Sequence, residues 1–232
     1  MKRLPEPRGL AQDRLRAGVR ALRTAAVAVA AAVVAGCAGS GSAERFFALN
    51  DGGVVQSTTT SASGGATAGL PGIVVSSVTV PELVDRPQIV TRDNANRVVV
   101  SEQNLWAEPV RSSVGRMLAT RLGRTLFEAG RPTQVAAYPQ ASIVDPFLRV
   151  TIDVVRFDAV PNGEAVVDAL WSIRRTSDGF VRTGRTVASS PIAGTDYDAI
   201  VSAWNEALGT VNRDVAATVL QFDAPTPKSP AR

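Results

Sequence analysis

The chain has 232 residues, of which 45% are hydrophobic, so it can bury one substantial core but not several domains of ordinary size. Its formal charge of +4 comes from the beginning of the chain, because residues 1–36 carry a net charge of +5 and residues 37–232 a net charge of −1. The absence of histidine excludes Ser-His-Asp and Cys-His catalysis and the commonest zinc sites. An aromatic content of 5% gives little surface for stacking on bases, and we expect no nucleic-acid partner.

Residues 1–36 have the pattern of a secretory signal peptide. A basic segment ends at Arg23, an apolar segment runs from Ala25 to Val34, and two small residues follow. About ten to twelve apolar residues are too few for a stable crossing of a hydrocarbon layer of roughly 30 Å. We therefore interpret this segment as a leader and not as a transmembrane helix.

The leader ends in the sequence VAGC, which matches the bacterial lipobox and makes Cys37 the first residue of the mature chain. Cys37 is the only cysteine, so no disulfide can form within one mature chain. The pattern predicts that Cys37 carries lipid, with fatty acids such as palmitate, and anchors the protein to a membrane. The alternative is a free cysteine that happens to follow a signal peptide. Ala38 stands where an aspartate would signal retention in the inner membrane of enteric bacteria, which favours the outer membrane.

Composition divides the mature chain into a tether, a globular region and a tail. Residues 37–72 hold the cysteine, a Gly/Ser tether and a segment rich in Gly, Ser and Thr, with a possible edge strand at residues 46–49. Residues 73–222 show strand and helix patterns and form the predicted globular domain. Residues 223–232 are rich in proline and are predicted to be disordered.

The globular region begins with strand patterns. An apolar run at residues 73–80 is a predicted strand, and the bend after it ends at Pro87. A short hairpin follows, with strands at 88–91 and 97–100 around an Asp-Asn-Ala-Asn turn. The sequence WAEP, which ends at Pro109, is predicted to open a helix.

This helix runs to about Ala129 and carries an apolar stripe that recurs every four residues, widened by Met117 and Phe127. Four arginines lie around the stripe and could bind anionic lipid headgroups or an acidic partner. The alternative is an ordinary solvated helix face. The four are Arg111, Arg116, Arg121 and Arg124.

The second half of the globular region predicts a meander and a final helix. Predicted strands lie at residues 133–136, 147–158, 165–175 and 180–188, and turns such as Asn162-Gly163 make the last three antiparallel neighbours. The final helix covers residues 196–222, with Thr195 and Asp198 as an approximate capping box. Its continuous apolar stripe is interpreted as core packing, with a partner-binding seam as the alternative. These patterns predict an α/β (α+β) fold: a single domain with a mixed, mostly antiparallel sheet and two main helices packed on one face.

The segment from Pro81 to Arg92, PELVDRPQIVTR, is followed by a turn, an apolar strand and WAEP. This combination resembles the ABC-transport auxiliary lipoproteins of the PqiC/YmbA type, and the likeness extends less sharply from about Phe46 to Phe222. The resemblance implies a lipoprotein of the outer membrane that assists MCE-protein systems, which move lipids across the bacterial envelope. It also implies a similar α/β fold.

Five residues of this segment are the candidate contacts with a partner: Leu83, Asp85, Arg86, Pro87 and Gln88. They lie in the most motif-like part of the chain, and Pro87 holds Arg86 extended. Asp85 and Arg86 have two other interpretations, as a structural pair that fixes the bend and as catalytic residues.

Carboxylate pairs are the remaining candidates for catalysis. Glu82 with Asp85 could supply a general acid and base, and so could Glu102 with Glu108. With 21 acidic residues in the chain, such pairs also arise by chance. We predict no catalytic residue, no metal site and no cofactor. Trp106 is predicted to anchor the core and not to serve as a ligand platform.

We expect a non-catalytic lipoprotein that is anchored in the outer membrane and faces the periplasm. It would dock on an MCE-domain protein and through it work with an ABC permease and ATPase. A phospholipid ligand and a homo-oligomer are compatible with that role. Two alternatives stay open: a structural or assembly lipoprotein of the envelope that handles no lipid, and a periplasmic hydrolase that uses carboxylates alone.

Overall fold

The computed structural model describes residues 43–50, 69–139 and 143–223. The predicted signal peptide, Cys37, most of the Gly/Ser/Thr-rich segment and nearly all of the Pro-rich tail lie outside the described residues.

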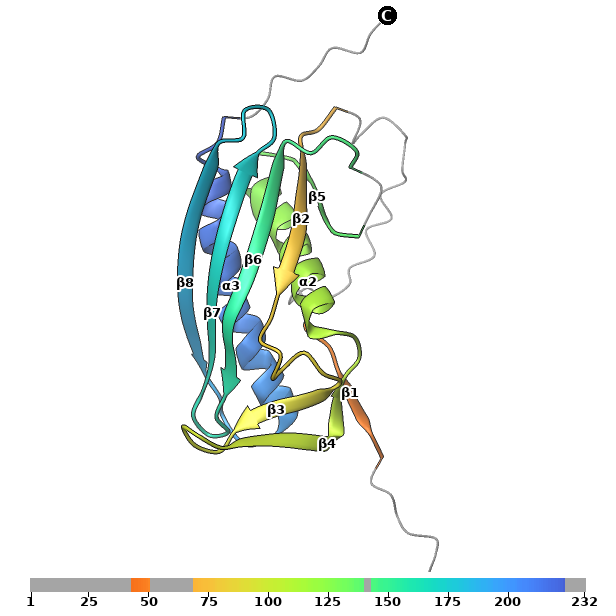
Figure 1. Ribbon diagram of the computed structural model, residues 1–232, viewed down its shortest axis with the longest axis vertical. Coiled ribbons are helices and arrows are strands. Elements are labelled where there is room, and N and C mark those ends of the chain that lie inside the picture. Colours follow the sequence, from red (N-terminus) through yellow and green to blue (C-terminus); the bar gives the residue numbers. More distant parts are fainter. Residues whose placement is uncertain (1–42, 51–68, 140–142, 224–232) are drawn as a thin grey trace, which may run out of the picture. The chain divides into compact units, whose positions relative to one another are not determined.

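The larger of two sheets has five strands in the order β5-β2-β6-β7-β8 (Figure 1). Strand β2 runs parallel to both β5 and β6, whereas β6, β7 and β8 form an antiparallel meander, as predicted. The β6–β7 turn places Asn162 at a φ of 57°, a left-handed conformation that asparagine tolerates. The strands are β2 (Gly72–Thr79), β5 (Gln134–Ala137), β6 (Leu148–Ala159), β7 (Glu164–Arg175) and β8 (Val181–Pro191).

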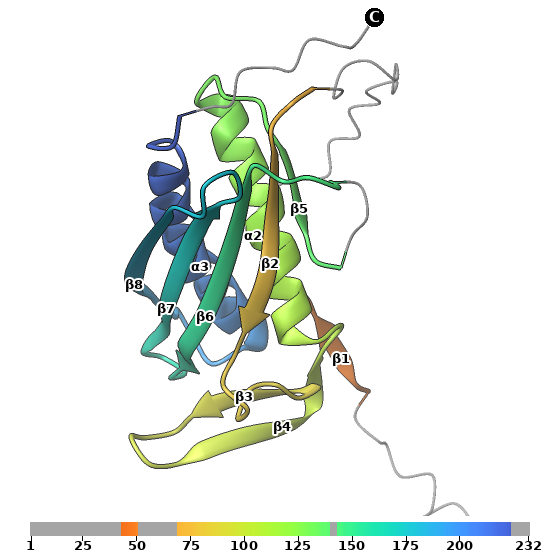
Figure 2. The same cartoon turned by 45° about the horizontal axis from the view of Figure 1, so that its top comes forward.

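Two helices, α2 (Val110–Glu128) and α3 (Tyr197–Val219), cover one face of this sheet (Figures 1 and 2). Their apolar stripes are buried as predicted, except that Phe127 points to solvent and does not widen the stripe of α2. The predicted capping box is wrong, because the α3 N-cap is Asp196, whose side chain accepts a hydrogen bond from the Ala199 amide at 2.8 Å. Within residues 43–50, 69–139 and 143–223, no helix lies on the opposite face of the sheet.

A second sheet has three strands in the order β1-β4-β3 and lies across one end of the larger sheet (Figure 2). Strand β1 (Arg45–Phe47) overlaps the expected edge strand and pairs parallel to β4 (Val98–Trp106). Strands β3 (Gln88–Arg92) and β4 form the predicted hairpin. Strand β4 is longer than predicted: Trp106 ends the strand, and the helix starts only after Pro109.

The two sheets share a core through three aromatic side chains. Trp106 is buried at the end of β4, with its ring centroid 5.6 Å from that of Trp204 in α3. Phe157 of β6 stacks on Trp204 with centroids 4.7 Å apart, and the Trp204 indole donates to the Asp158 carbonyl at 3.0 Å. Trp106 is therefore a core anchor, as predicted, and the fold is the expected α/β domain with two helices on one face.

Candidate functional site

The bend between β2 and β3 holds the five predicted contact residues together. The Val84 and Asp85 amides both donate to the Pro81 carbonyl, at 3.0 and 3.2 Å, and the Val84 side chain is buried. The preceding side chain, Leu83, is 37% exposed. Arg86 and Pro87 are exposed as well, and Gln88 is half-buried where β3 begins. The bend is thus a hydrogen-bonded turn that presents an apolar and a cationic side chain to solvent.

Asp85 has a different partner from the one considered in the sequence. Its carboxylate forms an ion pair with Arg111 in the first turn of α2, and the Arg111 Nε atom lies 3.3 Å from Asp85 Oδ1. The structure therefore gives Asp85 a role in fixing the bend, but against α2 and not through a pair with Arg86. Among the five predicted residues, Leu83, Arg86 and Pro87 are the exposed ones.

Glu108, one of the four carboxylates considered for catalysis, is held by its neighbours. Its carboxylate accepts hydrogen bonds from the Arg116 guanidinium and from the Ser113 hydroxyl, the latter at 2.9 Å. The hydrogen bonds from Arg116 are the main reason that the pKa of Glu108 lies below its ordinary value; burial opposes them, and the bond from Ser113 adds to them. A carboxylate held in its ionised form is opposite to what a general acid needs.

The arginines of α2 make contacts within the protein. Arg111 and Arg116 pair with Asp85 and Glu108, as described above. Arg121 donates from one nitrogen to the Asn205 carbonyl at 2.7 Å and from another to the Asn50 carbonyl at 2.8 Å. These three arginines are therefore neither a bare solvated face nor a set of free cationic groups.

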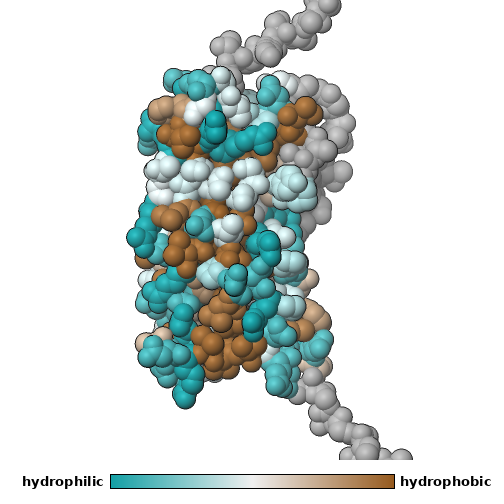
Figure 3. Space-filling view, in the orientation of Figure 1, coloured by the Kyte–Doolittle hydropathy of each residue, from teal (hydrophilic) through white to brown (hydrophobic). Residues whose placement is uncertain are grey.

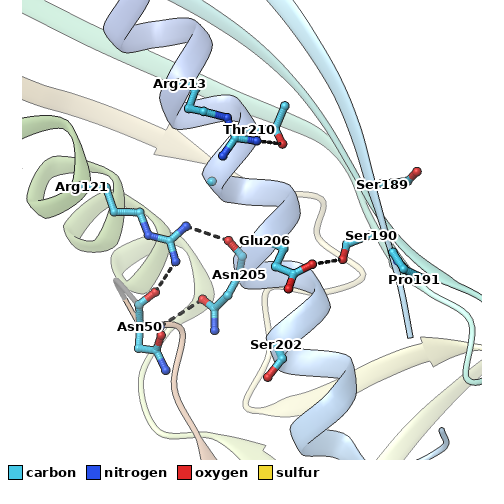
Figure 4. Close-up of a pocket in the computed structure, with 11 residues that line it drawn as sticks. Asn50, Arg121, Ser189, Ser190, Pro191, Ser202, Asn205, Glu206, Thr210 and Arg213 are labelled. Atoms are coloured by element: carbon cyan, nitrogen blue, oxygen red, sulfur yellow. Dashed lines mark hydrogen bonds between the residues drawn. The ribbon is translucent and has the colours of Figure 1, made fainter. Parts of the chain in front are cut away.

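A polar groove of about 640 Å³ lies beside α3 (Figure 4). On one side of it Arg121 joins Asn50 to α3, and the Asn50 amide donates to the Asn205 side-chain oxygen at 3.1 Å. On the other side the Ser190 hydroxyl donates to the Glu206 carboxylate. Sequence reasoning missed this groove, because Asn50 and Asn205 are 155 positions apart and neither belongs to a motif. The contacts fasten the segment after β1 to both helices.

The opposite end of the domain carries a cluster of cations and rings. Arg175 and Arg182 lie over the rings of Phe180 and Phe222, with 5.4 to 6.0 Å between guanidinium carbon and ring centroid. Arg175 also donates to Asp178, which lowers the pKa of that carboxyl to about 2. An apolar pocket of about 260 Å³ lies at the same end of the helices, lined by Ile73, Leu126, Phe147 and Val219 among others.

The face of the five-stranded sheet without helices carries apolar side chains in the open. Val155, Leu170 and Val187 come from three adjacent strands and are all exposed. Figure 3 shows apolar surface in the middle of this face and again toward the end where the β3–β4 hairpin lies. Two ion pairs border the exposed valines and leucine, Asp168 with Arg185 and Asp158 with Arg156.

Two kinds of site are absent from the part of the chain that the structure describes. No group of three or more acidic, histidine or cysteine side chains is arranged to hold a metal ion there. Neither α2 nor α3 has the length and apolarity that a crossing of the membrane demands.

Comparison with protein families gives one match. The model of the ABC-type transport auxiliary lipoprotein component matches residues 54–216, which is well over half of the chain. None of the curated protein sequences matches the chain.

Two solved structures have a similar fold. The crystal structure of an uncharacterised protein superimposes with a TM-score of 0.59 at 16% identity, covering 76% of this chain and 99% of the other. The crystal structure of protein XCC0632 from Xanthomonas campestris, of the family DUF330, gives a TM-score of 0.50 at 21% identity and covers 66% of this chain and 85% of the other. At these identities the likeness concerns the fold alone.

Proposed function

The chain belongs to the ABC-type transport auxiliary lipoproteins, and on that premise we propose that it is the outer-membrane accessory component of an MCE system that moves phospholipid between the two membranes. The family match confirms the resemblance seen in the sequence around PELVDRPQIVTR. It carries the transport role, because an auxiliary component works with a transporter. The MCE partner, the outer membrane and the phospholipid cargo go beyond the family match and are our proposal.

The anchor in this proposal is Cys37. The lipobox VAGC and the lack of any other cysteine support its lipidation, and the family is one of lipoproteins. We expect that mature protein from bacterial membranes carries lipid on Cys37, and that Cys37→Ser protein is recovered in the soluble periplasmic fraction. Intact mass and membrane fractionation measure the two results. Wild-type protein without added lipid mass would contradict the anchor.

The docking surface in this proposal is the bend, through Leu83, Arg86, Pro87 and Gln88. The ion pair of Asp85 with Arg111 holds the bend against α2. An exposed apolar side chain three positions from an exposed arginine is a combination that interfaces favour, since arginine and apolar anchors are enriched in their centres. The proposal assigns no catalytic role to the chain, which the lack of histidine and the ionised form of Glu108 support.

A crosslinking experiment tests the docking surface. Tagged protein is crosslinked in the periplasm, purified from membranes and analysed by mass spectrometry, with Leu83→Asp as the variant. Leu170→Asp is the matched control, because Leu170 is a leucine of similar exposure, 43% against 37%, on the helix-free face of the sheet. We expect that the wild type and Leu170→Asp recover an MCE-domain protein and that Leu83→Asp recovers at least tenfold less, as a loss of about 1.4 kcal/mol or more predicts.

Other outcomes of the same experiment decide against parts of the proposal. Recovery of cell-wall or outer-membrane assembly proteins in place of a transporter component would favour a structural lipoprotein that handles no lipid. Recovery of the MCE protein by Leu83→Asp but not by Leu170→Asp would move the docking surface from the bend to the open face of the sheet.

A further inference from the structure

Strand β8 forms one margin of the five-stranded sheet, and within the described residues no strand pairs with its outer side (Figures 1 and 2). The strand has 11 residues, whereas β5 at the other margin has four. It pairs with β7 along its whole length without a register shift. A long open edge offers a row of backbone donors and acceptors to an extended chain, and proteins commonly shorten, bend or cover such edges.

The hydrogen bonds at the two ends of β8 show which of its backbone groups face outward. The Arg175 amide donates to the Phe180 carbonyl at 2.8 Å. At the other end the Ile192 amide donates to the Gly163 carbonyl, also at 2.8 Å. In an antiparallel pair the backbone groups of alternate residues point to the same neighbour, so even-numbered residues of β8 bond to β7 and odd-numbered ones point away from it. The outward residues are all exposed: Val181, Thr183, Arg185, Val187 and Ser189.

A further strand beside β8 has room on both faces of the sheet. On the helix-free face, Val187 is 63% exposed. On the other face α3 packs against β8, but the polar groove of about 640 Å³ opens between α3 and the end of the strand (Figure 4). Ser189, Ser190 and Pro191 line its β8 side. Side chains that an added strand directs toward the helices can therefore enter this groove.

Charge disfavours a second copy of β8 as the added strand. An antiparallel pairing of all five outward residues with the same five of another copy places Arg185 opposite Arg185, and like charges directly opposite are destabilising. Arg185 bonds to Asp168, yet its side chain stays 60% exposed. In the groove the exposed Arg213 donates to Thr210 and forms no ion pair within the described part of the chain. Both cations favour a carboxylate on the added strand.

We propose that β8 is a strand-addition site, at which an extended acidic segment of a partner protein pairs antiparallel with residues 181–189 as a sixth strand. Backbone hydrogen bonds to the outward residues supply the affinity, and side chains supply the specificity. An acidic residue fits opposite Arg185, and β-branched residues fit beside Val181 and Val187. The proposal goes beyond the docking surface at the bend and does not rest on it.

Photo-crosslinking in living cells tests the site on the full chain. Benzoylphenylalanine replaces Thr183, Val187 or Ser189, one at a time, and mass spectrometry identifies the crosslinked residues. We expect crosslinks to one acidic segment of another protein, at positions that move backward along that segment as the probe moves forward along β8, which is the register of an antiparallel strand. A probe at Val155 is the matched control and should crosslink at least tenfold less. Val155 is 51% exposed on the same face but belongs to β6, two strands from the margin.

Proline at an outward position tests the backbone groups themselves. Val187→Pro removes an amide that points away from β7, so the ladder between β7 and β8 stays intact, and thermal unfolding checks that the protein folds. With the probe at Thr183, crosslinking should fall at least tenfold, because a carbonyl of the partner loses its donor. Val187→Thr keeps the amide and should crosslink like the wild type. Ser189→Pro also removes an outward amide and serves as the second variant.

The same measurements can overturn the proposal. Crosslinks to this same chain would rule out the partner segment. Strand addition would be ruled out by crosslinks without a consistent register, by their absence, or by an equal yield from the probe at Val155. An unchanged yield in folded Val187→Pro protein would show that the outward amide has no part in the contact.

Discussion

At the scale of single residues, the arginines of α2 join segments that are far apart in the sequence. Arg111 holds the bend through Asp85, Arg116 holds the loop before α2 through Glu108, and Arg121 holds the segment after β1. Each of these arginines holds in place a segment that lies outside the periodic helices and strands.

The Glu108–Arg116 pair should make stability depend on pH. Because the hydrogen bonds from Arg116 lower the pKa of Glu108 in the folded state, the pair stabilises the fold above the unfolded pKa of about 4.3 and loses this contribution as the pH falls through the lower folded value. We expect Glu108→Gln to lower the free energy of unfolding at pH 7 by up to about 1 kcal/mol, since the pair is partly exposed.

Urea unfolding of the Cys37→Ser protein at pH 7 and pH 3 measures this effect. The difference between wild type and Glu108→Gln should shrink at pH 3. Glu102→Gln serves as the control, because Glu102 is exposed on β4 and its substitution should change stability little at either pH. A difference for Glu108→Gln that is equal at both pH values would show that the side chain acts through packing and not through its charge.

At the scale of elements, periodicity was a good guide where one face of an element is buried. The meander and both helices begin and end within about three residues of their predicted limits, because alternation and the four-residue stripe report burial directly. The limits failed around Trp106. The predicted strand ended at Val100, but β4 continues to Trp106, whose side chain is buried against Trp204 of α3.

The pairing of strands that are distant in the sequence could not be predicted from the sequence, for a different reason. The parallel pairs of β2 with β5 and β6, and of β1 with β4, have no turn between them whose residues set the partner. The same limit holds for the candidate site. The exposed bend was predicted from its motif, but the Asp85–Arg111 pair bridges 26 positions, and the groove around Asn50 and Asn205 has no local signal.

The packing of β7 against β8 depends on one glycine. A Cβ atom at Gly184 would lie 2.1 Å from the Trp171 ring, which is fixed by a hydrogen bond from its indole to Thr186 at 3.1 Å. We expect Gly184→Ala to lower the free energy of unfolding by about 1–3 kcal/mol or more, because the ring must move within a packed layer. Thermal unfolding measures the change.

Gly123→Ala in α2 is the matched control for that substitution. Its Cβ atom would meet Val135 at 3.6 Å, an ordinary contact, and alanine favours a helix over glycine by about 1 kcal/mol. The control should therefore keep or raise stability. A Gly184→Ala protein as stable as the wild type would mean that Trp171 turns aside without loss.

At the scale of the whole molecule, the aromatic cluster of Trp106, Phe157 and Trp204 makes one domain of two sheets. We expect Trp106→Ala to lower the free energy of unfolding by about 3–5 kcal/mol, since it removes a buried ring at the junction. Urea unfolding and the near-ultraviolet circular dichroism of the remaining tryptophans measure this. Phe127→Ala is the control, because that ring is exposed and its loss should change stability by less than about 0.5 kcal/mol.

The parallel pairing of β1 with β4 also has a mechanical meaning. A protein that is anchored to a membrane at one end of its chain and bound to a large assembly carries tension whenever the two move apart. Strand β1 receives that tension first, and a pull along its axis loads its hydrogen bonds to β4 together, in shear, and not one after another. Arg121 donates a hydrogen bond to the Asn50 carbonyl, three residues after β1, and holds the chain at a second point. Under the anchoring that we propose at Cys37, the hydrogen bonds between β1 and β4 and the contact of Arg121 with Asn50 would therefore resist a pull on the beginning of the chain before the force reaches the core.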